Sequence, residues 1–216
     1  MATVPFTDFY NEVLPEVPGC LEAVALNAIL NAAIVFCERT KVHKVDLDPI
    51  TLLANTPTTA FVVLASAPQT RVHEIREAVY GTTSLEFRDP DWLRINLDPI
   101  WRTKTGTPQY ITQDNEESFR VVPYLTVDAT SALNLFVALK PTATATDIDD
   151  RLWREYGEVI AAGALARLMM SPKKSYTNIA LAGANNAIFE EAVARITGKV
   201  FKGHVRSRQR VKAHYL

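Results

Sequence analysis

Hydrophobic positions recur with a helical period at both ends of the chain and with a shorter period in the middle. From Cys20 to Thr40, apolar residues form two adjoining stripes, and polar positions fall mainly on a strip through Asn27, Asn31 and Glu38. A helix that is apolar almost all round is buried on several sides. The pattern therefore predicts a long helix here, with more apolar surface than one small core requires.

Other segments with helical patterns flank this one and close the chain. A short helix is expected near the N-terminus, with Thr7 as its N-cap and Pro15 as its stop. Helical periodicity returns over residues 151–171 and again over about 178–197, where Gly198 is well placed as a C-cap. The first of these two helices follows three aspartates that can cap it: Asp147, Asp149 and Asp150. Its many glycines and alanines would let another helix approach closely.

The middle of the chain, residues 42–139, reads as short strands and turns. Residues 71–81 alternate, which predicts Val72, Glu74, Arg76 and Ala78 on one side of a strand. A hairpin is expected with Asp114-Asn115 at its turn. About seven short strands in this stretch fit a small antiparallel sandwich or barrel.

These patterns together predict an α+β fold. Its helical bundle is built from N- and C-terminal helices, an antiparallel β-domain is inserted between them, and an arm extends from the C-terminus. The expected parts are residues 1–42 and 147–198 for the helical domain, 43–146 for the β-domain and 199–216 for the arm.

Charge is distributed unevenly along a chain of ordinary composition. Of the 216 residues, 48% are hydrophobic and 22% are charged, which excludes global disorder. The last eighteen residues hold six of the 23 Lys and Arg, two His and no acid, so residues 1–198 carry a net charge of −7. An acidic body with a basic end favours an acidic partner surface, another copy of the chain, or nucleic acid.

The basic C-terminal segment admits two interpretations. It could be a disordered end that only keeps the protein soluble. However, apolar side chains are spaced through its basic residues, which is typical of a segment that becomes ordered on a partner. Fully extended, eighteen residues reach roughly 60 Å, enough to cross a neighbouring subunit.

The sequence predicts no catalytic, cofactor or metal site. It has no phosphate-binding glycine loop and no nucleophile elbow. Its histidines are scattered, and Cys20 and Cys37 are expected to be reduced thiols. No signal peptide is expected, and the apolar run from Leu21 to Cys37 is expected to be too short and too polar to span a membrane.

Five stretches taken in order resemble the head–tail adaptor (neck) proteins of tailed bacteriophages. They are "DFYNEVLPEVPGC", "NAAIVFCERTKVHKVDLDPI", "WRTKTGTPQYI", "RLWREYGEVIAAGALARLMMSPKKSYTN" and the basic tail. The likeness covers nearly the whole chain and rests on combination and order, since none of these stretches is a catalytic signature. It is weakest over residues 56–91.

The resemblance implies a structural, non-enzymatic virion protein at the head–tail interface, assembled in the host cytoplasm. Such adaptors form a ring, commonly dodecameric, on the portal protein. The helical part faces the portal, the β-domain faces the next tail, nozzle or tube protein, and genomic DNA passes through the channel without specific binding. No cofactor and no membrane partner are implied.

The C-terminal arm would dock on the portal, with arginines making bidentate contacts to carboxylates. The predicted docking residues are Lys199, Phe201, Lys202, His204, Arg206, Arg208, Arg210, Lys212, Tyr215 and Leu216. The apolar surplus of the long N-terminal helix also predicts subunit contacts, and the candidate residues are Leu26, Ile29, Phe36, Trp153 and Tyr156.

Two other functions remain open from the sequence. One is a different tail component, such as a tail-completion or terminator protein, which would bind the tail tube and not the portal. The other is a nucleic-acid-binding protein that uses the basic tail on phosphates, with an affinity that falls steeply with salt.

Overall fold

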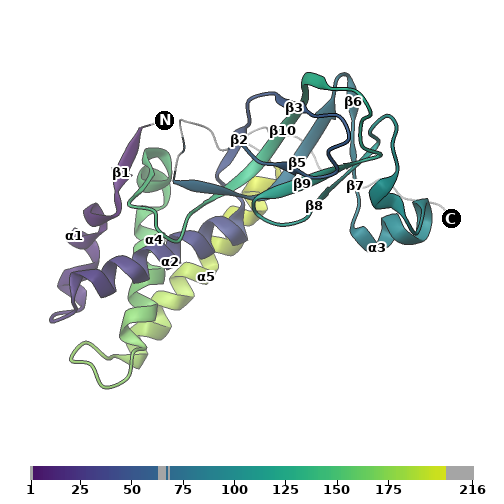
Figure 1. Cartoon of the computed structure of the whole chain (residues 1–216). Helices are drawn as coiled ribbons and strands as arrows, with labels where there is room; N and C mark the ends of the chain where they lie inside the picture. Colours follow the sequence, from purple (N-terminus) through teal and green to yellow (C-terminus); the bar gives the residue numbers. More distant parts are fainter. Residues whose placement is uncertain (1, 63–66, 68, 203–216) are drawn as a thin grey trace.

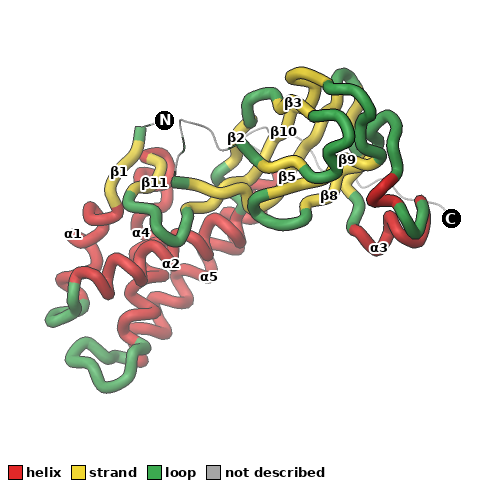
Figure 2. Tube along the Cα trace, viewed as in Figure 1, coloured by secondary structure: helices red, strands yellow, loops and turns green. Residues whose placement is uncertain are grey.

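The computed structural model describes residues 2–62, 67 and 69–202. The chain is mixed α+β, with a helical domain at one end of an elongated molecule and a β-domain at the other (Figures 1 and 2). Two separate apolar cores correspond to these domains, one formed by residues 6–37 and 145–196 and one by residues 45–139. The fold class predicted from the sequence is confirmed for the helices and the central β-domain. The predicted arm lies outside the described residues from position 203 onward.

Helices form at both ends of the chain, where the helical periodicity predicted them. The first segment is a short run of helical turns that begins after Pro5 with no side-chain cap, so the predicted N-cap role of Thr7 is wrong. Asp149 caps the second long helix by accepting a hydrogen bond from the Arg151 backbone N–H at 2.8 Å. The elements are η1 (Phe6–Phe9), α1 (Tyr10–Val13), η2 (Leu14–Glu16), α2 (Glu22–Thr40), α4 (Asp150–Met169) and α5 (Ile179–Lys202).

Aromatic side chains fill the core between α2, α4 and α5. Phe36 on α2 lies 5.2 Å from Tyr156 and 6.4 Å from Phe189, between ring centroids. Phe189 on α5 packs directly over Gly163 on α4, where an added Cβ would lie only 2.7 Å from its ring. The close helix approach expected from the small residues of α4 is therefore present at Gly163.

A short N-terminal strand ties the start of the chain to the start of α4. Strand β1 (Thr3–Pro5) pairs antiparallel with β11 (Asp147–Asp149) in a two-stranded sheet. The sequence predicted neither strand, because three residues are too few to show an alternating pattern.

Two sheets pack face to face in the β-domain and enclose its core. The first, called the main sheet below, contains β2 (Lys44–Asp46), β3 (Ile50–Leu52), β5 (Thr70–Tyr80), β6 (Thr83–Ser84) and β10 (Ala129–Pro141). The second contains β4 (Thr59–Ala60), β7 (Glu86–Phe87), β8 (Tyr110–Gln113) and β9 (Ser118–Val122). The sandwich and the β8–β9 hairpin agree with the sequence. The pairing of β7 with β8 is parallel, which the antiparallel prediction missed.

Strand β5 departs from the alternation expected of it. Its buried residues are Val72, Ile75 and Ala78, at intervals of three instead of two. The register against β10 shifts twice, and His73 and Arg76 are the bulged residues of β5 that have no paired residue on β10. Each bulge moves the following side chain to the other face of the sheet. The predicted placement of Glu74 and Arg76 with Val72 is therefore wrong.

A small satellite core lies at the far end of the β-domain. Here α3 (Pro90–Trp92) is capped by Asp89 and continues into a π-helical turn, η3 (Leu93–Leu97), and a 3-10 turn, η4 (Trp101–Thr103). Leu93 and Trp101 are buried against Val122.

The last helix is longer than the sequence indicated. Gly198 was expected to end it, but α5 continues to Lys202 and Val200 packs against the helical core. The first four residues of the predicted extended arm are therefore helical. A glycine lowers helix propensity without ending a helix when packing continues beyond it.

Replacing Gly163 with Ala should destabilise the protein by about 1–3 kcal/mol, because the added methyl overlaps the Phe189 ring. Denaturant-induced unfolding measures this loss. The matched control is Gly183→Ala on α5, where a Cβ meets nothing within 4 Å. That variant should gain about 0.5–1 kcal/mol through helix propensity. Equal effects at both sites would contradict the close contact.

Candidate interfaces and the junction between the domains

A buried lysine joins the helical domain to the β-domain. Lys140 lies near the end of β10 and is only 8% exposed. Its Nζ donates to Glu38 on α2 at 2.6 Å and also to Glu116 in the β8–β9 turn. Burial alone would lower the pKa of Lys140, but the hydrogen bonds that its ammonium donates to these two carboxylates raise the pKa above the ordinary lysine value. The ammonium therefore remains charged and holds three separate elements together.

A second ion pair lies beside the first. Lys41, the residue after α2, has a left-handed backbone with φ of 53°, and its side chain pairs with Glu74 on β5. Glu74 also accepts from Arg76 at 2.9 Å. Although burial opposes it, the two cations lower the pKa of Glu74 below its ordinary value. The end of α2 is thus fixed to both long strands of the main sheet.

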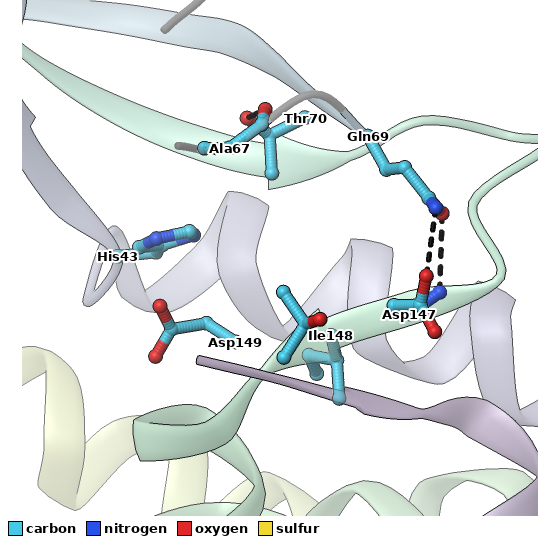
Figure 3. A pocket seen from close by; sticks show the side chains of 8 residues that line it. His43, Ala67, Gln69, Thr70, Asp147, Ile148 and Asp149 are labelled. Atoms are coloured by element: carbon cyan, nitrogen blue, oxygen red, sulfur yellow. Dashed lines mark hydrogen bonds between the residues drawn. The ribbon is translucent and has the colours of Figure 1, made fainter. Parts of the chain in front are cut away.

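A small cavity of about 70 Å³ lies between the N-terminal strand pair and the β-domain (Figure 3). Gln69 closes one side: it donates to the Asp147 carboxylate at 2.8 Å and accepts from the Asp147 backbone N–H at 3.1 Å. His43 and Asp149 line the other side. The cavity is too small for an organic cofactor, since ligand sites usually measure roughly 300 Å³ or more.

His43 is a buried histidine without a hydrogen-bond partner. Its side chain lies in the short connection between α2 and β2, and neither ring nitrogen has a partner among the described residues. Burial lowers its pKa below the ordinary value, and the charge of Asp149 opposes this only in part. The imidazole is therefore neutral in the folded protein near pH 7.

A larger groove lies where the C-terminal segment begins. Its volume is about 690 Å³, and it runs between the end of α5, the start of α4 and the edge of the main sheet. Lys199 and Val200 line it from α5, and Lys44 on β2 donates to the Val200 carbonyl at 3.1 Å. The chain therefore leaves α5 at the junction between the domains.

The predicted docking residues fall mostly outside the described part of the chain. Lys199 is exposed on α5, and the backbone of residues 201 and 202 is helical. His204, Arg206, Arg208, Arg210, Lys212, Tyr215 and Leu216 lie beyond the described residues. The role of this segment in docking stays a prediction.

The predicted subunit-contact residues lie largely inside one chain. Ile29 and Phe36 are completely buried in the helical core, so their side chains present no surface to a neighbour. Leu26, Trp153 and Tyr156 are partly buried against the same core. The surplus of apolar surface on α2 is real, but the free part of it lies on other residues.

Several of the exposed apolar side chains lie at the two ends of the molecule, a feature that sequence periodicity missed. At the tip of the helical domain, Leu21 is 72% and Ile179 is 76% exposed, with Met170 and Leu181 also exposed. At the far end of the β-domain, the exposed residues are Phe87, Ile95 and Ile100. Large apolar side chains that remain in water in a single chain are typical of protein contact sites.

No group of three metal-ligating side chains occurs within residues 2–62, 67 and 69–202. By length and hydropathy α2 is apolar enough to cross a membrane, contrary to the expectation from its sequence. This is weak evidence, since nine α2 residues are buried in the protein and core helices also meet this criterion.

Replacing Lys140 with Ala should destabilise the protein by about 1–3 kcal/mol, because two carboxylates lose their buried partner. Chemical denaturation measures the loss. The control is Arg94→Ala, which removes a largely exposed pair with Asp91 and should change stability by less than about 0.5 kcal/mol. If both variants behave alike, Lys140 does not brace the junction.

Acidification should destabilise the protein through His43. Its folded pKa lies below the unfolded value of about 6.5, so its stabilising contribution is complete above that pH. It is lost as the pH falls toward the folded pKa. Unfolding curves at pH 7.5 and 5.5 should differ less, by about 1 kcal/mol, for His43→Phe than for the unmodified protein. The same pH dependence in both proteins would show that other groups cause it.

Comparison with known proteins finds a match to one family model. A search of curated proteins found no match. The family model described as SU10 adaptor protein matches residues 6–212, which include both domains and most of the basic C-terminal segment. The chain therefore belongs to this family of bacteriophage adaptor proteins and is a component of the virion.

Proposed function

We propose that this adaptor is a non-enzymatic joint between the portal protein and the next tail component, built as a ring around the DNA channel. The observation that carries the proposal is the family match over residues 6–212, which spans both domains. The location of exposed apolar residues supports it, because the helical tip and the α3 end can each contact a different partner.

The junction supports this role mechanically. A connector has to keep its two contact surfaces in a fixed relation while DNA moves past. The ion pairs of Lys140 and Lys41 fix the end of α2 to the main sheet, so the two domains are braced against each other. The net charge of −7 over residues 1–198 also suits a channel wall, since it would not attract phosphates.

The basic C-terminal segment is the proposed docking element for the portal. It begins at the junction, beside the groove lined by Lys199 and Val200. Fourteen residues beyond Lys202 can reach roughly 45–50 Å when extended. Its arginines at positions 206, 208 and 210 suit acidic partner surfaces, and apolar residues between them suit pockets.

A chain that ends at Lys202 should lose portal binding and keep its fold. Residues 199–202 are retained because they belong to α5 and Val200 contributes to the core. The measurement is the mass of complexes formed with purified portal rings, together with the thermal unfolding midpoint of the truncated chain. Unchanged portal binding by the truncated chain would refute this docking role.

Substitution of the three arginines tests whether portal binding needs only their positive charge or also the bidentate geometry of the guanidinium group. Replacement of Arg206, Arg208 and Arg210 by Lys keeps the charge but loses the bidentate fork, so binding should weaken roughly tenfold or more. Replacement by Gln should weaken it further. Binding to a tail tube instead of the portal would support the tail-completion alternative, and binding to any DNA with a steep salt dependence would support a nucleic-acid role.

A further inference from the structure

The outward face of α5 is apolar and uncovered in a single chain. No charged residue occurs from position 178 to 189, although this stretch forms the first half of an exposed helix. The residues opposite the core are all exposed: Ala180, Gly183, Ala184, Ala187 and Ile188. A surface helix normally carries polar and charged side chains on this face.

The outward face of α2 is also uncharged and uncovered, although Asn27 and Asn31 make it partly polar. No charged residue occurs from position 23 to 37. The residues opposite the core are Ala23, Val24, Asn27, Asn31 and Ile34, of which only Ile34 is partly covered. In contrast, the exposed side of α4 carries the charged residues Arg151, Arg154, Glu155 and Glu158. The uncharged faces are therefore specific to α2 and α5.

The two outward faces run in the same direction and at matching heights. Both helices start at the tip of the helical domain, where Ser175 before α5 donates to the Pro18 carbonyl before α2 at 3.1 Å (Figure 1). Further along, Arg39 of α2 pairs with Glu190 of α5 at 2.6 Å. The Thr197 hydroxyl of α5 also donates to the Arg39 carbonyl at 3.4 Å. Asn31 lies eight residues before Arg39 and Ala187 ten residues before Thr197, so their heights differ by roughly 3 Å.

Opposite charges stand at the same level near the tip. Glu16 and Glu22 are exposed beside the start of α2, and Lys173 and Lys174 are exposed in the turn before α5. Within the described residues, none of these four side chains forms an ion pair. A neighbouring molecule held at the same height could pair acids with lysines.

We propose that the partner of each face is a second copy of this chain, with the outward face of α5 packed on the outward face of α2 of the next copy. The alanines and glycine of α5 make a flat surface, and Val24, Asn27, Asn31 and Ile34 of α2 project toward it. Small residues let the two helix backbones approach closely. The lysines of one copy then lie opposite the acids of the next.

This arrangement is heterologous, since two different faces meet, and it repeats from copy to copy until a ring closes. It rests on the proposed function, in which all copies present the same end to the portal. Parallel pairing of α5 with α5 would place Lys173 and Lys174 against the same lysines, and pairing of α2 with α2 would place Glu22 against Glu22. Like charges at the same height oppose both of these contacts.

Disulfide trapping in the full-length protein tests the pairing. Cys20 is first replaced by Ser. Cys37 stays, since it is completely buried and burial raises its pKa to about 12, which keeps the thiol unreactive. Asn31→Cys and Ala187→Cys are made as separate proteins and oxidised alone and mixed. A covalent dimer is expected only in the mixture, and a ladder of larger species is expected from the protein that carries both substitutions.

The control is Glu158→Cys on the charged side of α4, which should not cross-link with Ala187→Cys. A dimer from either single variant alone would show pairing of like faces and overturn the proposal. The absence of a dimer in the mixture would also overturn it. Neither result depends on the portal, so the contact between copies and the portal-docking role can fail separately.

A charge placed on the outward face gives a second readout. Ala187→Glu buries a carboxylate in the proposed contact and should weaken self-association roughly tenfold or more in sedimentation measurements. Its thermal unfolding midpoint should not change, because Ala187 is exposed in the single chain. Self-association equal to that of the unmodified protein would contradict the contact.

Discussion

The relation between the two domains depends on the buried ammonium of Lys140. A charge that has left water must be partnered, and its partners here come from α2 and from the β8–β9 turn. Any rotation of the helical domain against the sandwich would separate the charge from at least one carboxylate. The cost of that separation makes the junction specific in geometry, whatever its net contribution to stability.

Strand β10 connects Lys140 to the rest of the β-domain. It is the longest strand, it pairs with β2, β3 and β5, and it ends next to α2. Lys140 therefore lies where the longest strand of the β-domain meets α2 of the helical domain. The bulges of β5 belong to the same arrangement, since they place Glu74 beside Lys41 while Ile75 stays in the core.

The sequence indicated the helices well because each buries enough residues to show a period. It indicated β5 as a strand but misplaced its faces, since bulges are set by pairing with β10 and not by the strand itself. It missed β1 and β11, which are too short for a pattern, and it ended α5 too early because the packing of Val200 is a tertiary contact. In the Lys140 cluster, Glu116 is 24 positions and Glu38 is 102 positions away from Lys140 along the chain. No local pattern can indicate contacts between residues so far apart in sequence.

The contrast between α2 and α4 bears on assembly. Both pack one side into the same core, but α4 keeps arginines and glutamates on its exposed side, whereas α2 keeps none from position 23 to 37. That difference gives α2 a hydropathy that would allow a membrane span. A core helix in a lone globule usually carries charged side chains on its outer side, and an outer side without them is typical of a contact surface. Burial of the inner side in its own chain, together with the proposed burial of the outer side against a neighbour, would account for the absence of charge from position 23 to 37.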